Sequence, residues 1–247
     1  MSIAYNLLIE PWIPVLSQEG QIELGLRDTL IKAHELQEIR DPLPIAEFGL
    51  YRLLVALVMD IFEIKTLSQL GNLISTGRFD PKTVDVYFNR YQDRFNLFDD
   101  DHPFLQSPNM DKEQERPLAG LLPSIPSGGA FNVFLHQNEQ DFAVSPAVAA
   151  RLLTTISPFM TAGGRGLSPS INGAPPWYVL LVSSKNLFET ICLNCCAIPI
   201  RNCASTSLPA WRNPKPVECR EYNEEVGLLE GQTWRPRRIK LIPGEQG

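Results

Sequence analysis

The sequence has few of the features that mark a secreted or membrane-spanning protein. Its longest clearly apolar stretch, residues 48–62, is interrupted by Arg52 and Asp60, whereas a membrane span takes roughly 20 mostly apolar residues. The first basic residue is Arg27, so the charged n-region of a signal peptide is missing. The five cysteines are an odd number, unlike the even disulfide framework of a small secreted domain. We therefore expect reduced thiols, a cytoplasmic protein and no membrane contact.

The sequence also lacks the short motifs of common enzymes. It contains neither the G-x-S-x-G elbow of a serine hydrolase nor the G-x-x-x-x-G-K-[ST] loop of a nucleotide-binding protein. With three histidines, candidates for a histidine general base are few. Residues Asp99, Asp100, Asp101 and His102 form one acidic cluster, for which a solvated turn is favoured over a divalent-metal site. We predict no cofactor, no metal and no catalytic residue.

Positive charge is scarce as well. The chain has 22 Lys and Arg against 28 Asp and Glu, a net charge of −6, which argues against an autonomous nucleic-acid binder. Residues 1–150 carry 11 basic and 21 acidic residues, whereas residues 151–247 carry 11 and 7. We expect any contact with a polyanion in the second part, or in loops that escape the acidic surface. The alternative is that the acidic part only keeps the protein in solution.

What is present is ordinary globular patterning, with 44% hydrophobic and 9% aromatic residues. The N-terminus reads as a hairpin, with residues 4–8 and 13–16 extended, a turn over 17–20 and a return strand over 21–24. Apolar periodicity behind Asp-Pro and Ser-Pro starts predicts helices. We predict an α+β fold, irregular and loop-rich, with several helices and small β-sheets. The predicted elements are helices over 28–37, 45–64 and 186–196, helices starting at Asp80-Pro81 and Ser145-Pro146, a buried strand over 177–182 and a last strand over 232–242.

Three cysteines recur at helical spacing. Cys192, Cys195 and Cys196 lie at i, i+3 and i+4. One interpretation is a metal site completed by Cys203 or Cys219. The other is core packing, because free cysteine is among the most buried residue types. Structural zinc sites usually take such pairs from turns, and this pair falls within a predicted helix. Core packing is therefore favoured.

A glycine-rich segment spans residues 161–173. Gly163, Gly164 and Gly166 surround Arg165. Glycines let backbone amides approach a phosphate or a groove floor closely, the arginine adds a positive charge, and the Asn172 amide can read base edges. A flexible connector is the competing interpretation.

Two further segments combine aromatic side chains with glycine or positive charge. Residues 127–133 place Phe131 after two glycines. An exposed aromatic there could stack on a base or fill a partner's pocket, although core burial is the ordinary alternative. Residues 234–240 place Arg237, Arg238 and two further cations beside Trp234, a modest polyanion-binding signal. On a strand these cations cannot all face one side.

Together these segments resemble a known family. The N-terminal Asn6-Leu-Leu-Ile-Glu-Pro-Trp-Ile-Pro-Val15 is similar to the opening of CasA, the large subunit of the type I-E CRISPR Cascade complex. Further matches follow in the family's order along essentially the whole chain. They are Ser75 to Asp80, Arg94 to Phe98, Pro103 to Gln106, Asn186 to Thr190 with Leu193-Asn194, Pro209 to Trp211, Gly227 to Leu229 and Thr233 to Ile239.

The resemblance implies a non-catalytic subunit that recognises the protospacer-adjacent motif in target double-stranded DNA. Such a subunit helps to form the R-loop and to recruit the helicase-nuclease, while the guide RNA reads the longer sequence. The glycine-rich loop of the family enters the minor groove, which implies a DNA-binding role for residues 163–166. We add Asn172, Arg237 and Arg238 from their chemistry. A second family loop docks near the guide RNA and other Cascade subunits, and matches Ala130, Phe131, Asn132 and Val133.

The chain departs from the family at its C-terminus. Typical members continue into a helical bundle, whereas this sequence stops at Gly247. We expect residues 1–247 to form a single N-terminal recognition domain. Two alternatives stay open, namely a scaffold subunit without DNA contact and a metal-dependent nuclease that uses residues 99–102.

Overall fold

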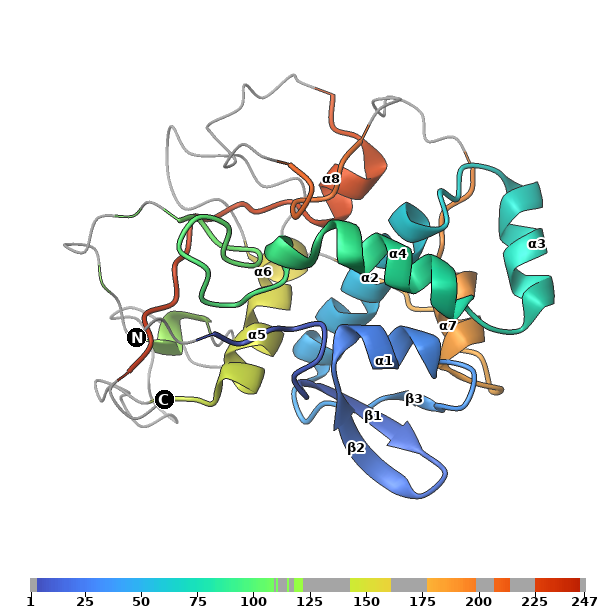
Figure 1. Ribbon diagram of the computed structural model, residues 1–247, viewed down its shortest axis with the longest axis horizontal. Coiled ribbons are helices and arrows are strands. Elements are labelled where there is room, and N and C mark those ends of the chain that lie inside the picture. Colours follow the sequence, from blue (N-terminus) through green and yellow to red (C-terminus); the bar gives the residue numbers. More distant parts are fainter. Residues whose placement is uncertain are drawn as a thin grey trace.

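The computed structural model describes residues 4–108, 110, 115, 118–121, 143–160, 177–198, 207–213 and 225–244. Within them, helices pack around a small antiparallel sheet, which confirms the predicted α+β class (Figure 1). The strands are β1 (Ile13–Ser17), β2 (Gly20–Leu24) and β3 (Glu38–Ile39). The helices are α1 (Leu26–Ile31), α2 (Pro44–Ile61), α3 (Leu67–Thr76), α4 (Pro81–Arg90), α5 (Pro146–Thr154), α6 (Ile156–Phe159), α7 (Leu187–Leu193) and α8 (Leu228–Gln232), with short 3-10 turns at Gln92–Arg94 and Leu118–Leu121.

The predicted N-terminal hairpin is confirmed over residues 13–24, whereas residues 7 and 8, which were expected to be extended, belong to a turn. β1 and β2 pair antiparallel from Ile13↔Leu24 to Ser17↔Gly20. Gly20 has a φ of 126°, a conformation that glycine adopts far more readily than other residues. The sequence did not indicate β3, which pairs with the other edge of β1 through Val15↔Ile39 and gives the order β2-β1-β3.

Helix α2 is the centre of the molecule. Nearly all of its side chains from Ala46 to Ile61 are buried, and it packs against α4, α5, α6, α7, α8 and β3. In Figure 1 the sheet lies on one side of α2 and α8 lies on the other. Gly49 lies against Thr154 of α5, where an added Cβ would meet Thr154 Oγ1 at 2.5 Å. The all-round apolar pattern predicted this burial, and α2 matches the expected helix over 45–64 except for its last turn.

The predicted helix starts are confirmed by their caps. Asp80 accepts a hydrogen bond from the Thr83 amide at 3.0 Å, and Asn186 accepts from the Glu189 amide at 2.9 Å. Ser145 caps α5 in the same way. Each side-chain oxygen satisfies one of the free amides at a helix start. The helix expected over 28–37 is shorter, because α1 ends at Ile31.

A buried polar network fastens residues 207–213 to the helices. Tyr87 of α4 donates to the Asp60 carboxylate of α2, and Trp211 Nε1 donates to the Tyr87 hydroxyl at 2.8 Å. Arg212 Nη1 donates to the other Asp60 oxygen at 2.7 Å. Burial, followed by the nearby Asp60 charge, raises the pKa of Tyr87 well above its usual range, so its proton stays in the network.

Two predicted strands are wrong. Residues 177–182 belong to no strand in the described part of the chain, and Trp177 and Val179 are 90% and 84% exposed. The Asn194 side chain accepts a hydrogen bond from the Leu181 amide at 3.0 Å. It also donates one to the Leu181 carbonyl at 2.8 Å. The side-chain amide thus takes the place of a neighbouring strand. The strand expected over 232–242 is instead the end of α8 followed by an irregular segment.

Helices α3 and α8 were not predicted.

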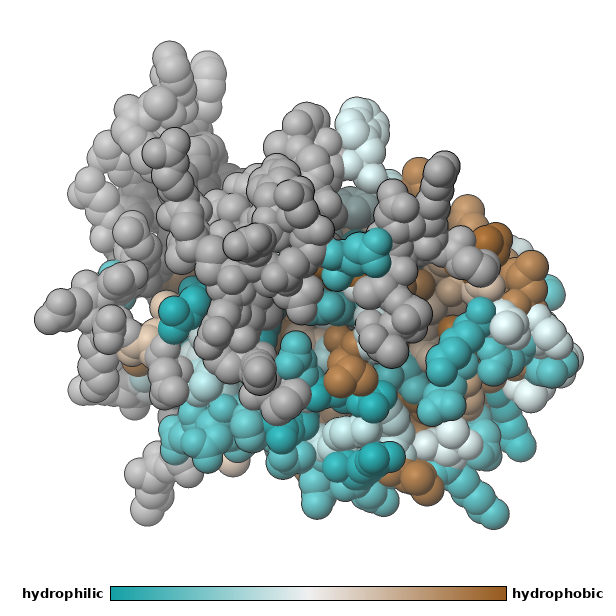
Figure 2. Space-filling view, turned by 90° about the horizontal axis from the view of Figure 1, so that it is seen from above, coloured by the Kyte–Doolittle hydropathy of each residue, from teal (hydrophilic) through white to brown (hydrophobic). Residues whose placement is uncertain are grey.

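Some apolar residues reach the surface, and Figure 2 shows them scattered among hydrophilic ones on the face seen from above. Within the described ranges, none of the helices combines the length and apolar character that crossing a bilayer needs.

Candidate nucleic-acid interface

The structure describes only part of the predicted site. Gly163, Gly164, Arg165, Gly166 and Asn172 lie outside the described residues, as do Ala130, Phe131, Asn132 and Val133. Arg237 and Arg238 are described and exposed. The interface is therefore built from Arg237, Arg238 and the residues that flank the glycine-rich segment.

The basic residues lie on a segment that we call the C-terminal strap, residues 234–241. It leaves the end of α8, and the Trp234 side chain anchors it because only 2% of that side chain is exposed. The Ser107 amide donates to the Ile239 carbonyl at 2.8 Å, the Leu241 amide donates to Gln106 Oε1 at 2.6 Å, and Lys240 Nζ donates to the Pro108 carbonyl at 2.9 Å. These bonds hold the strap beside residues 106–108.

The strap presents its positive charge to solvent. Arg237, Arg238 and Lys240 are all exposed. The sequence argument held that these three cations could not share one face of a strand. That argument does not apply here, because the strap is not a strand and its side chains need not alternate.

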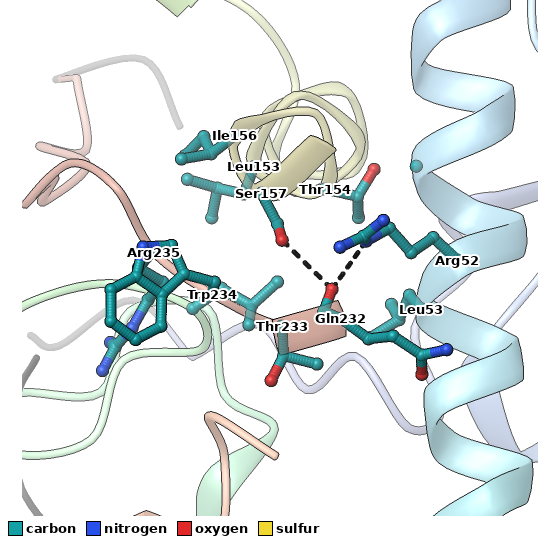
Figure 3. Close-up of a pocket in the computed structure, with 12 residues that line it drawn as sticks. Arg52, Leu53, Leu153, Thr154, Ile156, Ser157, Gln232, Thr233, Trp234 and Arg235 are labelled. Carbon is teal, nitrogen blue, oxygen red and sulfur yellow. Dashed lines mark hydrogen bonds between the residues drawn. The ribbon is translucent and has the colours of Figure 1, made fainter. Parts of the chain in front are cut away.

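Arg52 joins α2 to the start of the strap. Its Nε donates to the Gln232 carbonyl at 2.8 Å and its Nη2 donates to the Gly231 carbonyl at 2.9 Å. These carbonyls stand at the negative end of α8, where a cation is stabilising. Ser157 Oγ of α6 donates to the same Gln232 carbonyl at 3.0 Å (Figure 3). Burial lowers the pKa of Arg52, although the guanidinium remains protonated.

The residues that flank the glycine-rich segment meet at the same place. Tyr178, which follows it, donates to the Pro158 carbonyl, which precedes it, at 2.7 Å. The Tyr178 ring stacks on Phe48 of α2 with centroids 4.7 Å apart, and Arg52 lies 5.7 Å from the centre of that ring. We call this cluster of Arg52, Ser157, Tyr178 and Gln232 the Arg52 joint. Described residues on either side of segment 161–176 thus meet the end of α8 in one cluster.

The hollow beside the Arg52 joint is about 20 Å³ and is lined by α2, α5, α6 and residues 232–235. That volume holds little more than one water molecule. The joint is therefore a packing contact that positions other elements, and it is no pocket for a ligand. Sequence reasoning noted Arg52 only as an interruption of an apolar stretch. A charged residue on a mostly buried helix is itself a signal, since it needs partners there.

The acidic cluster forms a turn. Asp99 Oδ1 accepts from the amides of Asp101 and His102 at 3.0 and 2.7 Å. In the portion that the structure describes, no set of three or more His, Cys, Asp or Glu side chains is arranged around a common point.

The described cysteines pack in the core. Cys192 and Cys195 are buried in the hydrophobic cluster, as core packing predicted. Burial raises the pKa of the Cys192 thiol to about 12 and that of Cys195 further. Cys203 and Cys219, the other candidate ligands of a metal site, lie outside the described residues.

Comparison with known proteins finds related sequences and structures. A family model described as CRISPR-associated protein Cse1 matches residues 6–247. CRISPR-associated protein CasA/Cse1 of Thermus thermophilus is 30% identical, over 98% of this chain and 50% of the relative. The crystal structure of Cse1 from Acidimicrobium ferrooxidans aligns with a TM-score of 0.75 and 26% identity, over 100% of this chain and 49% of that one.

A chain in a structure described as a CRISPR RNA-guided surveillance complex aligns with a TM-score of 0.65 and 25% identity, over 86% of this chain and 47% of that one. The chain thus spans about half the length of the relatives that it matches.

Proposed function

Because the chain belongs to the CRISPR-associated Cse1 (CasA) family, we propose that it acts in an RNA-guided type I CRISPR surveillance complex as the recognition domain of the large subunit. It recognises the protospacer-adjacent motif in duplex DNA, promotes R-loop formation and helps to recruit the helicase-nuclease. Its partners are the guide RNA, the other Cascade subunits and the target DNA, and it contributes no catalytic residue. Residues 1–247 act as one domain in this role.

The Arg52 joint is the observation that carries the proposal. Recognition of a short duplex motif needs an element that enters a groove and cations that hold the phosphates in register. Tyr178 and Pro158 bring the flanks of the glycine-rich segment together, and Arg52 and Ser157 attach the α8 end to the same point. In this proposal, the flanks of the groove-reading segment and the start of the strap that carries Arg237 and Arg238 meet at one hydrogen-bonded cluster.

A gel-shift titration tests the DNA-reading role. The guide-RNA complex is reconstituted with the chain or without it, and is titrated against duplexes with and without the adjacent motif. Arg165→Ala and Gly164→Asp are expected to remove the preference for the motif. The double variant Arg237→Gln, Arg238→Gln is expected to weaken binding of the complex to both duplexes by the same factor, because phosphate contacts carry no sequence information. It is also expected to reduce the salt dependence of that binding.

Arg78→Gln is the matched control, because Arg78 is exposed and lies outside the strap. If the complex discriminates the two duplexes equally well without the chain, the DNA-reading role is wrong and the chain is a scaffold subunit. Cross-linking to target DNA separates these two cases independently.

The proposed docking role of residues 130–133 has its own test. Phe131→Ala is expected to reduce co-purification of the chain with the guide-bound complex, since an aromatic anchor at an interface contributes much of the binding energy. Unchanged co-purification would remove this segment from the docking surface.

A further inference from the structure

A second cleft shares Leu105 and Arg235 with the hollow beside the Arg52 joint. Its volume is about 80 Å³, and it is lined by Arg94, residues 101–106, Pro108, Ala210, Trp211, Asn213 and Arg235. In Figure 3 the Arg235 guanidinium points away from Arg52 and Gln232. The proposed function makes no use of this cleft.

Arg235 is a half-buried cation with an incomplete set of partners. Its Nη1 donates to the Gln106 carbonyl at 2.6 Å. Its Nε atom is buried and lacks a hydrogen-bond partner, and no carboxylate of the described residues lies within ion-pair distance of the guanidinium. Burial lowers the pKa of Arg235 to about 10, so the group is still charged at neutral pH. A buried charge without a counter-charge is costly.

A second guanidinium faces the same cleft. Arg94 lines it and pairs through Nε with Asp93 at 3.0 Å. That pair leaves the Nη groups of Arg94 without a hydrogen-bond partner among the described residues. His102 and Asp101 also line the cleft and are exposed. Asp101 is the carboxylate among the lining residues and Asp93 is paired with Arg94, so Arg235 is the cation at this cleft that lacks a carboxylate partner among the described residues.

We propose that this cleft binds a phosphate group, with Arg235 in its wall and Arg94 at its rim. A guanidinium presents paired N–H donors that match two phosphate oxygens. The phosphate supplies the negative charge and the acceptor that Arg235 lacks. Its source is either a nucleic-acid backbone or a small free phosphate. Arg235 precedes Arg237 and Arg238 on the strap, so a backbone held here continues along the exposed cations. The inference does not depend on recognition of a DNA motif.

Isothermal titration of the 247-residue chain with inorganic phosphate tests the proposal, at constant ionic strength set with chloride. The wild type and Arg78→Gln are expected to show saturable binding and a rise in Tm with phosphate concentration. Arg94→Gln is expected to weaken binding roughly tenfold or more, as the loss of a charge-assisted hydrogen bond predicts. Arg235→Lys keeps the charge but loses the paired donors, and is expected to bind more weakly than the wild type.

A ten-residue oligothymidylate distinguishes the sources. If the oligothymidylate competes with inorganic phosphate for the wild type but not for Arg94→Gln, the ligand is a nucleic-acid backbone. If phosphate binds and the oligothymidylate does not compete with it, the ligand is the free anion. The absence of saturable phosphate binding to the folded wild type overturns the proposal. So does equal binding by Arg94→Gln and Arg78→Gln. These readouts use the chain alone, so they can fail or succeed independently of the gel shifts with the whole complex.

Discussion

The contact between α2 and α5 at Gly49 gives a sharp test of the fold around the Arg52 joint. A Cβ added at Gly49 would lie 2.5 Å from Thr154 Oγ1, 2.8 Å from the Thr154 carbonyl oxygen and 2.9 Å from its carbonyl carbon. Two of these three atoms are backbone, so rotation of the Thr154 side chain cannot relieve the contact. Gly49→Ala must therefore push α5 away from α2.

The magnitude follows from two opposing terms. Overpacking of a core typically costs 1–3 kcal/mol, and contact with backbone places Gly49→Ala near the upper end, at about 3 kcal/mol. Alanine is favoured over glycine in a helix by about 1 kcal/mol. The net loss is therefore about 2 kcal/mol, or roughly 4–8 °C in Tm for a chain of this length.

Gly71 provides the matched control. It lies on α3, is exposed, and has nothing within 4 Å of an added Cβ. Gly71→Ala gains the same helix preference without the contact, so it is expected to raise the Tm slightly. Thermal unfolding followed by circular dichroism compares the two variants. A Gly49→Ala variant as stable as Gly71→Ala would show that α2 and α5 do not approach as described.

Two further predictions concern buried polar and thiol groups. Asp60→Asn leaves Arg212 without its carboxylate and is expected to lower the free energy of unfolding by roughly 2–4 kcal/mol. Asp85→Asn, at the exposed pair with Arg27, should lower it by less than about 1 kcal/mol. Equal losses of the two variants in urea unfolding would contradict the network. At pH 8 a maleimide should spare Cys192 and Cys195 in the native chain and modify both in denaturant, as read by peptide mass spectrometry. Their native pKa values are raised, so the stability they contribute is present below pH 9 and is lost as the pH rises towards 12; rapid native labelling would refute their burial.

Local signals were sufficient for most of the element starts. Asp80-Pro81 and Ser145-Pro146 each place a side-chain acceptor before a proline, and such a pair specifies a helix start without help from the rest of the fold. The burial of α2 followed from its apolar composition in the same way. These features depend on residues within one or two turns of each other.

The errors depend on residues far apart in the sequence. Residues 177–182 have strand composition, but their hydrogen-bond partner is the Asn194 side chain, 13 positions from Leu181. The strap is held by residues 106–108, which no local pattern connects with residues 239–241. The strap cations were predicted as a binding element, whereas the Arg52 joint was not. Arg52 is 179 and 180 positions from its carbonyl acceptors, and only the folded chain brings them together.

The Gln232 carbonyl has a mechanical consequence. Its oxygen accepts from Arg52 Nε and Ser157 Oγ at once, so the end of α8 is tied to α2 and to α6 through one atom. A load on the strap that passes its bonds to residues 106–108 and reaches Gln232 is therefore shared between two helices. The Ser157 bond makes α6, the helix that precedes residues 161–176, one of the two that share such a load.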